Sequence, residues 1–578
     1  MSEPGLLTLW AETLLDALAE AGVTDVIASP GSRSTPFLLA AVGHPRLRCH
    51  HVIDERAAAF FALGHARVTA RPALLLCTSG TAGAHYLPAV IEAAHAHLPL
   101  LVLTADRPPE LHGCGASQTI DQTRLYGEHA RRFVDLGLPD GSLGAFRALR
   151  RTAAQAVFAA LHPLPGAVHL NARAKKPLEP IAPSAELAAL AHAACQAPLP
   201  RPAAPPPRPD AAALADVAAA CRRARRGLIV CGPAPLAQTH AREAVATLAR
   251  ATGFPILAET TSQLRTDSLP GACPAFDHLF ADEGFAATHA PDLVLQLGAA
   301  PISSAWERAL ARHLDAELVI IAPHGWPDPG SRSRHVLVAG VAETAHALAA
   351  ALAGHPPEPG AWTASFARAD RAAWRAVDRV LAENPLLTEG AVTRATLASV
   401  PEGGLFAIGN SLPVRHVDRF ARTAPAHVLS QRGAAGIDGL VAGAAGAASA
   451  ANAPVTLLLG DISLLHELGG LALAQRLRIV VLHNDGGRIF EELPLAQTGH
   501  DLTPFTTPHG ADLGHAARLF GLRHARASTR AELTAALAEP QHGLLIEAIV
   551  PPHGAAEELA RVRAAVATEL AADLGAAS

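Results

Sequence analysis

Short apolar segments alternate along the chain with longer segments in which apolar residues recur at helical spacing. Residues 26–28, 73–77 and 100–104 are continuously apolar, and each ends in a polar loop followed by further chain with a helical pattern. Residues 6–22 begin the chain with that helical pattern. Continuously apolar strands that alternate with helices are typical of a parallel sheet covered on both faces. Ligands bind such sheets at the carboxyl ends of the strands, where these polar loops lie.

The same alternation continues to the end of the chain, with two interruptions. Residues 196–210 (QAPLPRPAAPPPRPD) and 354–360 (GHPPEPG) are rich in proline or glycine, which favours extended segments between domains. We therefore predict an α/β fold of three consecutive doubly wound parallel-sheet domains. Their ranges are 1–190, 211–355 and 356–578, with a proline-rich linker at 191–210. Further strands are expected at 228–231, 293–297, 317–321, 405–408, 455–459, 479–482 and 543–549.

Charge and composition exclude several classes of function. The 47 Lys and Arg against 52 Asp and Glu give a net charge of −5, which argues against a nucleic-acid-binding protein. Lysine occurs only at Lys175 and Lys176, so Schiff-base chemistry and Walker-type phosphate binding are disfavoured. The seven cysteines show no CxxC spacing, which favours a cytoplasmic protein without zinc sites. The uncharged residues 439–460 predict a small-residue helix and a strand rather than a membrane span.

Two groups of polar residues close neighbouring strands in the last third of the chain. Gly460 and Asp461 follow one predicted strand, and Asn484 to Gly487 follow the next. A carboxylate and an amide oxygen at one sheet edge suit Mg²⁺, which usually also binds phosphate oxygens, and a glycine there lets backbone amides approach the phosphate. The alternative is a helix cap at Asp461 and an ordinary turn at Asn484. His483, next to Asn484, is a further candidate for contact with a cofactor.

A third candidate is Glu55, at the start of a helical segment whose following turns are unusually apolar. One interpretation is that the carboxylate only stabilises the positive end of the helix dipole. The other is that it faces a dry interface and contacts a nitrogen atom of a ligand.

Together, these features resemble thiamine-diphosphate-dependent enzymes, in which a glutamate from one domain meets a metal–diphosphate site on another. The resemblance implies the three-domain architecture of these enzymes, with thiamine diphosphate and Mg²⁺ (or Mn²⁺) as cofactors. Glu55 would be the catalytic residue at the aminopyrimidine ring. Ile437 would either bend the cofactor or simply pack in the core. The implied metal ligands are Asp461, Asn484 and the carbonyl of Gly486, and further implied cofactor contacts are Thr78, Gly80, Gly460 and Ser463.

Six motifs in the same order are similar to those of one family within this group, the 2-succinyl-5-enolpyruvyl-6-hydroxy-3-cyclohexene-1-carboxylate (SEPHCHC) synthases. They are SPGSRSTP at 29–36, TSGTA at 78–82, TADRPPEL at 104–111, GNSLPVR at 409–415, RGAAGIDG at 432–439 and NDGGRIF at 484–490. The resemblance implies decarboxylation of 2-oxoglutarate and addition of the product to isochorismate, in menaquinone biosynthesis. Both substrates are dicarboxylates, which arginine binds better than lysine. The implied substrate contacts are Ser32, Arg33, Arg107, Gln118, Ser411, Arg415 and Arg432, with an apolar wall of Ile489, Phe490 and Leu493.

The chain departs from the family pattern at Ser304 and Ala305, where members often carry a basic residue. One carboxylate contact of the family is therefore expected to be absent.

The resemblance also implies a homodimer or homotetramer with active sites at the subunit interface. Two alternatives remain open. An acetolactate-synthase-like or simple 2-oxo-acid decarboxylase is disfavoured by the arginine-rich loops, and a non-catalytic thiamine-diphosphate sensor is disfavoured by the presence of Glu55.

Overall fold

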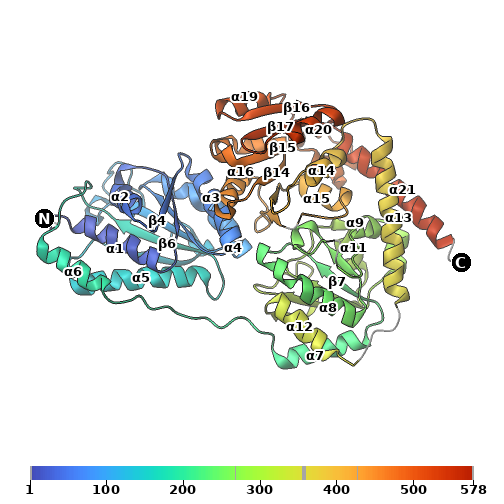
Figure 1. The fold of residues 1–578 in the computed structure, drawn as a ribbon, viewed down its shortest axis with the longest axis horizontal. Helices are drawn as coiled ribbons and strands as arrows, with labels where there is room; N and C mark the ends of the chain where they lie inside the picture. The colour runs from blue at the N-terminus through green and yellow to red at the C-terminus, as the bar shows by residue number, and fades with distance from the viewer. Residues whose placement is uncertain (1–2, 267–268, 355–359, 426, 576–578) are drawn as a thin grey trace. The chain divides into compact units, whose positions relative to one another are not determined.

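The computed structural model describes residues 3–266, 269–354, 360–425 and 427–575. Within these residues the strands form three sheets of six, five and six strands, and each pairing between neighbours is parallel (Figure 1). The predicted α/β fold with parallel sheets and alternating helices is confirmed. The predicted boundary between residues 355 and 356 lies outside the described residues.

The first sheet has the strand order β2-β1-β3-β4-β6-β5. The loops after β1 and β3 therefore lie where the strand order reverses, which is where doubly wound sheets bind ligands. Helices α1, α2, α5 and α6 share one apolar core with alternate residues of the central strands. The bounds are α1 Leu6–Glu20, β1 Asp25–Ala28, α2 Thr35–Gly43, β2 Arg48–His51, α3 Glu55–Thr69, β3 Ala73–Cys77, α4 Leu87–Ala96, β4 Leu100–Asp106, β5 Ala130–Asp135, α5 Leu143–Leu161, β6 Ala167–Arg173 and α6 Ala185–Cys195.

The second sheet has the order β11-β10-β9-β7-β8. Its strands alternate between two cores: Leu228 and Val230 of β7 pack with α9, α13 and α21, whereas Ile229 and Cys231 pack with α7, α8 and α12. Burial on both faces explains why this strand is apolar without alternation. The bounds are α7 Ala211–Arg223, β7 Gly227–Cys231, α8 Arg242–Thr252, β8 Ile256–Ala258, α9 Phe276–Ala281, α10 Glu283–Thr288, β9 Leu293–Leu297, α11 Ser304–Arg312, β10 Glu317–Ala322, β11 Ser333–Val338, α12 Val341–Ala351 and α13 Ala361–Glu383.

The third sheet, β13-β12-β14-β15-β17-β16, repeats the strand order of the first. The loops after β12 and β14 occupy its reversal point. The bounds are α14 Glu389–Ala398, β12 Leu405–Ile408, α15 Leu412–Phe420, β13 Val428–Ser430, α16 Leu440–Ala451, β14 Val455–Gly460, α17 Asp461–His466, β15 Leu477–His483, α18 Thr503–Thr506, α19 Leu513–Leu519, β16 Arg523–Ala527, α20 Arg530–Ala538, β17 Leu544–Ile549 and α21 Gly554–Gly575.

The chain forms two compact units. The first contains residues up to Pro205 together with Gln431–Asn452 and Glu467–Ala474, and the second contains the rest. Helix α16 therefore belongs to the first unit, where it packs across α3. The predicted domain ranges stay a prediction; within the predicted linker, α6 continues to Cys195, and residues 196–210 are neither helix nor strand.

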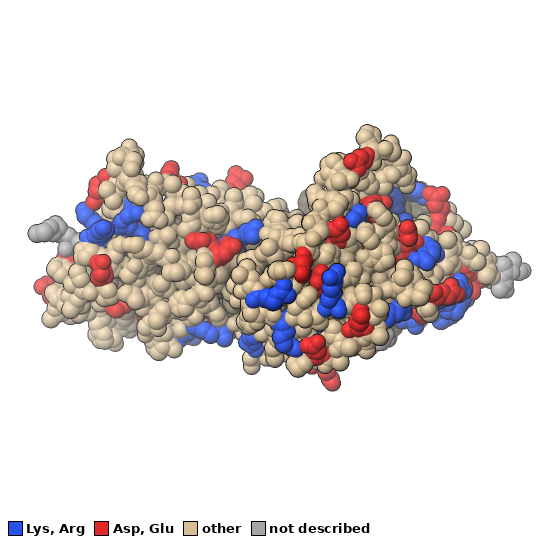
Figure 2. Space-filling model, turned by 90° about the horizontal axis from the view of Figure 1, so that it is seen from above, with Lys and Arg blue, Asp and Glu red and all other residues tan. Residues whose placement is uncertain are grey.

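Charged side chains of both signs are scattered over the face drawn in Figure 2, where Lys and Arg lie among Asp and Glu. Of the helices in the described part of the chain, none combines the length and the apolar character that crossing a membrane requires.

Candidate active site

The predicted site residues are divided between the two units, and each group is described separately. In the first unit, Glu55 is the first residue of α3. The Asp54 carboxylate accepts hydrogen bonds from the backbone N–H groups of Arg56 (2.8 Å) and Ala57 (3.4 Å), which fixes the first turn. Glu55 is half-buried, and the next turns of α3 are buried. Burial, and in smaller part the charge of Glu55, raises the pKa of the Cys77 thiol above its usual range. The Glu55 carboxylate is therefore close enough to Cys77, the last residue of β3, to influence the pKa of its thiol.

The turn after β3 contains Thr78 and Gly80, two predicted cofactor contacts. Gly80 has a φ of 91°, a conformation that glycine adopts without strain. Its N–H donates to the side-chain oxygen of Gln122 (3.0 Å). Gln118 lies beside it, because a Cβ atom on Gly80 would be 3.6 Å from the Gln118 Cα. The turn also touches the loop after β1, where Ser32 is exposed.

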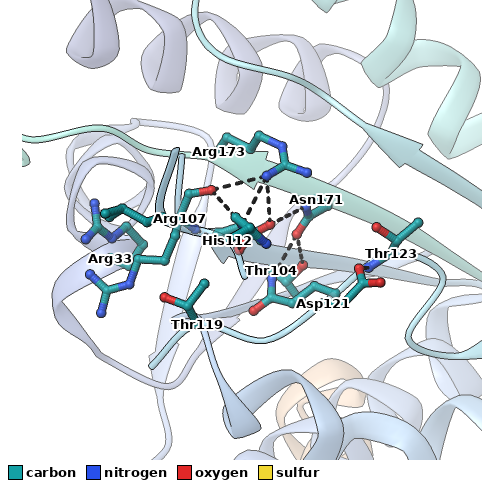
Figure 3. Close-up of polar contacts among 12 residues, drawn as sticks. Arg33, Thr104, Arg107, His112, Thr119, Asp121, Thr123, Asn171 and Arg173 are labelled. Atoms are coloured by element: carbon teal, nitrogen blue, oxygen red, sulfur yellow. Dashed lines mark hydrogen bonds and ion pairs between the residues drawn. The ribbon is translucent and has the colours of Figure 1, made fainter. Parts of the chain in front are cut away.

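Arg33 and Arg107 form a pair of neighbouring cations (Figure 3). Arg33 is 3% exposed and donates to the Ala174 carbonyl (2.7 Å). Burial, and then the positive charge of Arg107, lowers the pKa of Arg33. In both residues the Nε atom is buried with no hydrogen-bond partner among the described residues. Two such guanidinium groups suit an anionic ligand with bidentate carboxylates.

The loop that carries Arg432 and Ile437 also belongs to the first unit. Glu92, which is 3% exposed, accepts from the N–H groups of Gly433 (3.0 Å) and Ala434 (2.7 Å) and is paired with Arg67. Arg432 and Ile437 are both half-buried. The structure thus brings both into the compact unit that contains Glu55.

In the second unit, the predicted metal ligands converge after β14 and β15. The buried Asp461 carboxylate accepts from the N–H groups of Ile462 (2.7 Å) and Gly486 (3.1 Å). Asn484 donates to Glu389 (2.8 Å), and its amide oxygen is buried without a partner in the described part of the chain. Gly486 has a φ of 140°, and a Cβ there would lie 2.3 Å from the Thr506 carbonyl oxygen.

These groups fit a hard divalent cation, because a buried carboxylate and a buried, unpartnered amide oxygen follow two neighbouring strands of the sheet. Burial raises the pKa of Asp461, and a bound cation would favour the ionised carboxylate. Asp485 takes no part in this cluster. Its carboxylate accepts from the N–H groups of His509 (3.0 Å) and Gly510 (2.9 Å). Of the other predicted cofactor contacts here, Gly460 ends β14 and Ser463 is buried in α17.

Two histidines adjoin Asp461. The ring atoms of His483 and His509 and the Asp461 carboxylate lie within 4.8 Å of one another. His509 Nδ1 accepts from the Ala511 N–H (2.9 Å), so its Nε2 carries the proton, 3.2 Å from Asp461. A hydrogen bond of His483 Nδ1 to Glu547 (2.7 Å) raises the pKa of His483. The N–H group of His509 is therefore directed at Asp461, and that of His483 Nδ1 is directed at Glu547.

Ser411 and Arg415 lie together at the start of α15. Arg415 donates to the Ser411 carbonyl oxygen (2.6 Å), and burial, followed by the charge of Arg419, lowers the pKa of Arg415. Ser411 has a φ of 69° and a ψ of −127°. Such strain in a non-glycine residue often accompanies a functional site.

The predicted apolar wall follows the metal ligands along the chain. Ile489 and Phe490 lie in a short 3₁₀ helix, Arg488–Glu492, and are half-buried. Leu493 is 42% exposed. The Phe490 ring packs against Phe505 at 5.5 Å between centroids. These residues form a partly exposed apolar surface.

The turn without a basic residue is bound by an acidic side chain from another part of the chain. Ser304 and Ala305 begin α11, and Ser303 caps it by accepting from the Trp306 N–H (3.2 Å). Glu259 accepts from the N–H groups of Ile302 (2.5 Å) and Ser303 (2.9 Å). The turn is therefore already bound to a carboxylate of its own chain.

A cavity of about 540 Å³ lies in the first unit beside the loop that begins at Arg107. Arg33 and Arg107 are not among the residues that line it. Its lining residues are Pro109, His112, Gly113, Thr119, Ile120, Asp121, Thr123 and Arg173.

Sequence reasoning missed the carboxylates that hold these loops. Each is buried and bound to backbone N–H groups or to a site residue, and none belongs to one of the six motifs. The only sequence signal is an acidic residue within an apolar segment, as in 87–96 (LPAVIEAAHA). The residues are Glu92, Glu389, Glu467 and Glu547, together with His509.

Comparison with known proteins adds two findings. Residues 10–125 match a family model described as thiamine pyrophosphate enzyme, N-terminal TPP binding domain. Over nearly its full length the chain is similar to curated 2-succinyl-5-enolpyruvyl-6-hydroxy-3-cyclohexene-1-carboxylate synthases. That of Sorangium cellulosum is 49% identical (99% of this chain, 97% of the relative), and that of Myxococcus xanthus is 42% identical (98% and 99%). The one from Haloarcula marismortui is 39% identical (93% and 94%).

Proposed function

Since the chain belongs to the family of SEPHCHC synthases, which are thiamine-diphosphate-dependent enzymes, we propose that it catalyses their reaction. It decarboxylates 2-oxoglutarate and adds the resulting succinyl-semialdehyde carbanion equivalent to isochorismate, giving SEPHCHC in menaquinone biosynthesis. The observation that carries the substrate class is the pair formed by Arg33 and Arg107. Two neighbouring like charges, one buried and one half-buried, with unpartnered Nε atoms are stabilised by a ligand that brings carboxylates.

Thiamine diphosphate, when bound, supplies the acidic thiazolium carbon that stabilises the carbanion equivalent. Glu55 holds a proton shared with a ring nitrogen of the aminopyrimidine, and its place at the start of a buried helix favours this role. Thr78, Gly80 and Ile437 orient the ring. Asp461, Asn484 and the carbonyl of Gly486 would hold Mg²⁺ (or Mn²⁺), and Gly460 and Ser463 would contact the cofactor.

The substrate carboxylates are bound by arginines because their planar forks match carboxylate geometry. Arg33, Arg107, Arg415 and Arg432 fill this role, with hydrogen bonds from Ser32, Gln118 and Ser411. Ile489, Phe490 and Leu493 contact the isochorismate ring and exclude water from it. With Ser304 and Ala305 in place of a basic residue, we expect weaker isochorismate binding than in members that carry one. We further propose a cytoplasmic homodimer or homotetramer with active sites at the subunit interface.

The deciding assay supplies purified protein with thiamine diphosphate, Mg²⁺, 2-oxoglutarate and isochorismate. Both isochorismate consumption and CO₂ release are followed. We expect both, in equal amounts. Release of CO₂ without ring consumption would point to a simple 2-oxo-acid decarboxylase, and neither signal to a non-catalytic sensor.

Two variants test the site assignment. Glu55→Gln should lower kcat by about 10²-fold or more, since a proton-holding group is lost, while calorimetry shows cofactor binding largely unchanged. Glu128→Gln, at an exposed position, is the matched control and should behave as wild type. Asp461→Ala should abolish the Mg²⁺-dependent part of cofactor binding. Unchanged cofactor affinity would contradict the metal assignment.

A further inference from the structure

A chain of buried hydrogen bonds joins the turn after β3 to the loop that begins with Arg107. The Gly80 N–H donates to Gln122 Oε1 (3.0 Å), and Gln122 Nε2 donates to Asn171 Oδ1 (2.8 Å). Asn171 Nδ2 donates to Asp106 Oδ2 (2.9 Å), and Asp106 Oδ1 accepts from the Arg107 N–H (2.7 Å). Gln122, Asn171 and Asp106 are each 1% exposed. We call these three side chains the relay.

The direction of the relay is fixed at both ends. A backbone N–H can only donate, so Gly80 requires the oxygen of Gln122. A carboxylate can only accept, so Asp106 requires the nitrogen of Asn171. The Asn171 oxygen then accepts from Gln122 and also from the Thr104 hydroxyl (2.9 Å). No amide in the relay can be reversed without placing two donors or two acceptors in contact.

The Arg107 peptide is also held from its carbonyl side. Arg173 Nη1 donates to the Arg107 carbonyl oxygen (3.3 Å), and His112 Nε2 lies 3.2 Å from the same atom (Figure 3). Arg173 is in turn paired with Asp135 (2.7 Å). The backbone of Arg107 is therefore fixed on both sides by groups that do not contact its guanidinium.

The hydrogen bonds to the Arg107 backbone oppose the repulsion between Arg107 and Arg33. The guanidinium of Arg107 lies close enough to Arg33 to lower its pKa, so the two charges repel each other. A loop without anchors would move Arg107 away until an anion bound. Holding the loop in advance removes that ordering cost from ligand binding.

We propose that Gln122, Asn171 and Asp106 are positioning residues that place Arg107 for the substrate carboxylate and couple that placement to the cofactor-side turn at Gly80. The inference rests on the proposed function, because it takes Arg107 as a substrate ligand. No relay side chain is assigned a contact with substrate or cofactor. Their effect on binding acts through the Arg107 and Gly80 backbones.

The first test uses Asn171→Asp and Gln122→Glu, which keep side-chain shape but replace a donor by an acceptor. Asn171→Asp places two carboxylates in contact, whereas Gln122→Glu places a carboxylate oxygen against the Asn171 amide oxygen and the Ala105 carbonyl oxygen. In both, we expect KM for at least one substrate to rise about tenfold, with kcat within about threefold, equivalent to about 1.4 kcal/mol of lost binding. Calorimetric titration of isochorismate into protein with thiamine diphosphate and Mg²⁺, without 2-oxoglutarate, should show weaker binding as well.

The second test is rescue. The double variant Asp106→Asn/Asn171→Asp moves the carboxylate one position along the relay and restores each donor–acceptor pair within it: the new amide donates to the new carboxylate, which still accepts from Gln122 and Thr104. Outside the relay, the double variant loses the ion pairs of Asp106 with Arg173 (3.5 Å) and His112 (3.4 Å). We expect KM and isochorismate affinity to return to within about threefold of wild type, while each single variant stays impaired.

Asp121→Asn is the control, an exposed residue of the same loop outside the relay, and it should match wild type. Melting temperatures are recorded for every variant. If the relay variants melt earlier but the folded protein keeps wild-type KM values and isochorismate affinity, the relay is only structural and the proposal fails. If the wild type itself neither binds nor consumes isochorismate, the proposed function fails instead.

Discussion

At the scale of the residue, Ser411 has a strained backbone conformation that a residue with only a structural role would not need. Its φ of 69° and ψ of −127° are unfavourable for any side chain, yet the chain has serine there at the start of α15. Arg415 donates to its carbonyl oxygen, which helps to hold the strained turn. A structural role alone would favour glycine at this position. The strain therefore favours the proposed role of the Ser411 hydroxyl in substrate binding.

Ser411→Gly should stabilise the protein and weaken the site. Relief of backbone strain should raise the free energy of unfolding by about 1 kcal/mol, after allowing for the greater freedom of glycine in the unfolded chain. Loss of the hydroxyl should raise KM severalfold. Ser411→Ala is the control, because it loses the hydroxyl but keeps the strain. It should share the KM increase without the gain in melting temperature, and equal melting temperatures for the two variants would contradict the strain argument.

The sequence predicts a site residue when its neighbours along the chain supply its context. Arg33 and Asp461 closely follow apolar strands, so their place at a sheet edge can be predicted from the sequence alone. Glu92 is different. It contacts a loop with candidate site residues through the N–H groups of Gly433 and Ala434, which lie more than 300 residues later in the sequence. No local pattern records such a contact.

At the scale of the element, the crossing of α3 and α16 depends on glycines. A Cβ on Gly64 would lie 1.8 Å from the Gly443 carbonyl oxygen, and one on Gly446 would lie 1.9 Å from the Phe61 carbonyl oxygen. Both contacts are with backbone, which cannot rotate away. The small residues of α16 thus set the distance between this helix and the one that begins with Glu55.

Gly64→Ala should therefore lower the free energy of unfolding by roughly 2–3 kcal/mol, since the added methyl group forces the two helices apart. Thermal unfolding of the purified protein measures this. Gly144→Ala in α5 is the matched control, because a Cβ there meets nothing within 4 Å. It should be neutral or slightly stabilising, as alanine is the better helix former. A Gly64→Ala protein as stable as the control would show that α3 and α16 are not in tight contact.

The N-terminus of α16 is capped by a carboxylate from outside the helix. Glu467 accepts from the N–H groups of Val441 (2.8 Å) and Ala442 (3.0 Å) and is 1% exposed. Burial raises its pKa to about 7, with Asp438 adding to the rise and the two N–H groups and Arg56 opposing it. The folded protein therefore binds a proton that the unfolded chain has released above about pH 4.5.

Because the folded state holds this proton, the contribution of Glu467 to stability falls as pH rises from about 4.5 to about 7, by at most about 3 kcal/mol, and is constant above that range. Glu467→Gln removes the titration. The melting temperature of the variant relative to wild type should therefore increase between pH 5 and 7 and level off at pH 8. A difference that does not change with pH would place the pKa of Glu467 near its ordinary value.

Strands were predictable where both faces are apolar and missed where they are not. The predicted range 73–77 is the observed β3, whose five residues are all buried. The edge strands β2 (Arg48–His51) and β5 (Ala130–Asp135) are half-exposed and polar, so no apolar run reveals them. Strand β6 is buried but carries His169 and Asn171, whose hydrogen bonds to Thr104 satisfy them inside the sheet. His169 and Asn171 interrupt the apolar pattern of β6 in the sequence, and they belong to the hydrogen-bond network that contains the relay.

At the scale of the whole molecule, the first and third sheets share one strand order, and the candidate site residues follow corresponding strands in the two sheets. The fourth strand in chain order is followed by Arg107 in the first sheet and by Asn484 in the third. The third strand is followed by Thr78 in one sheet and by Asp461 in the other. The repeat is invisible in the sequence because a shared topology needs only apolar strands, whereas the loop residues differ between the two sheets.

Glu55 belongs to the first unit and Asp461 to the second, so the proposed assembly can be tested with one variant in each. The variants are Glu55→Gln and Asp461→Ala, and each is expected to be inactive by itself. If each active site takes Glu55 from one copy of the chain and Asp461 from another, a mixed dimer has one site with both defects and one with neither. Co-expression with random pairing should then restore about a quarter of wild-type activity per site. If both residues come from the same copy, every site carries one defect and the mixture stays inactive. Light scattering on the same sample shows whether dimers or tetramers formed, so an inactive mixture of oligomers would contradict the interface proposal directly.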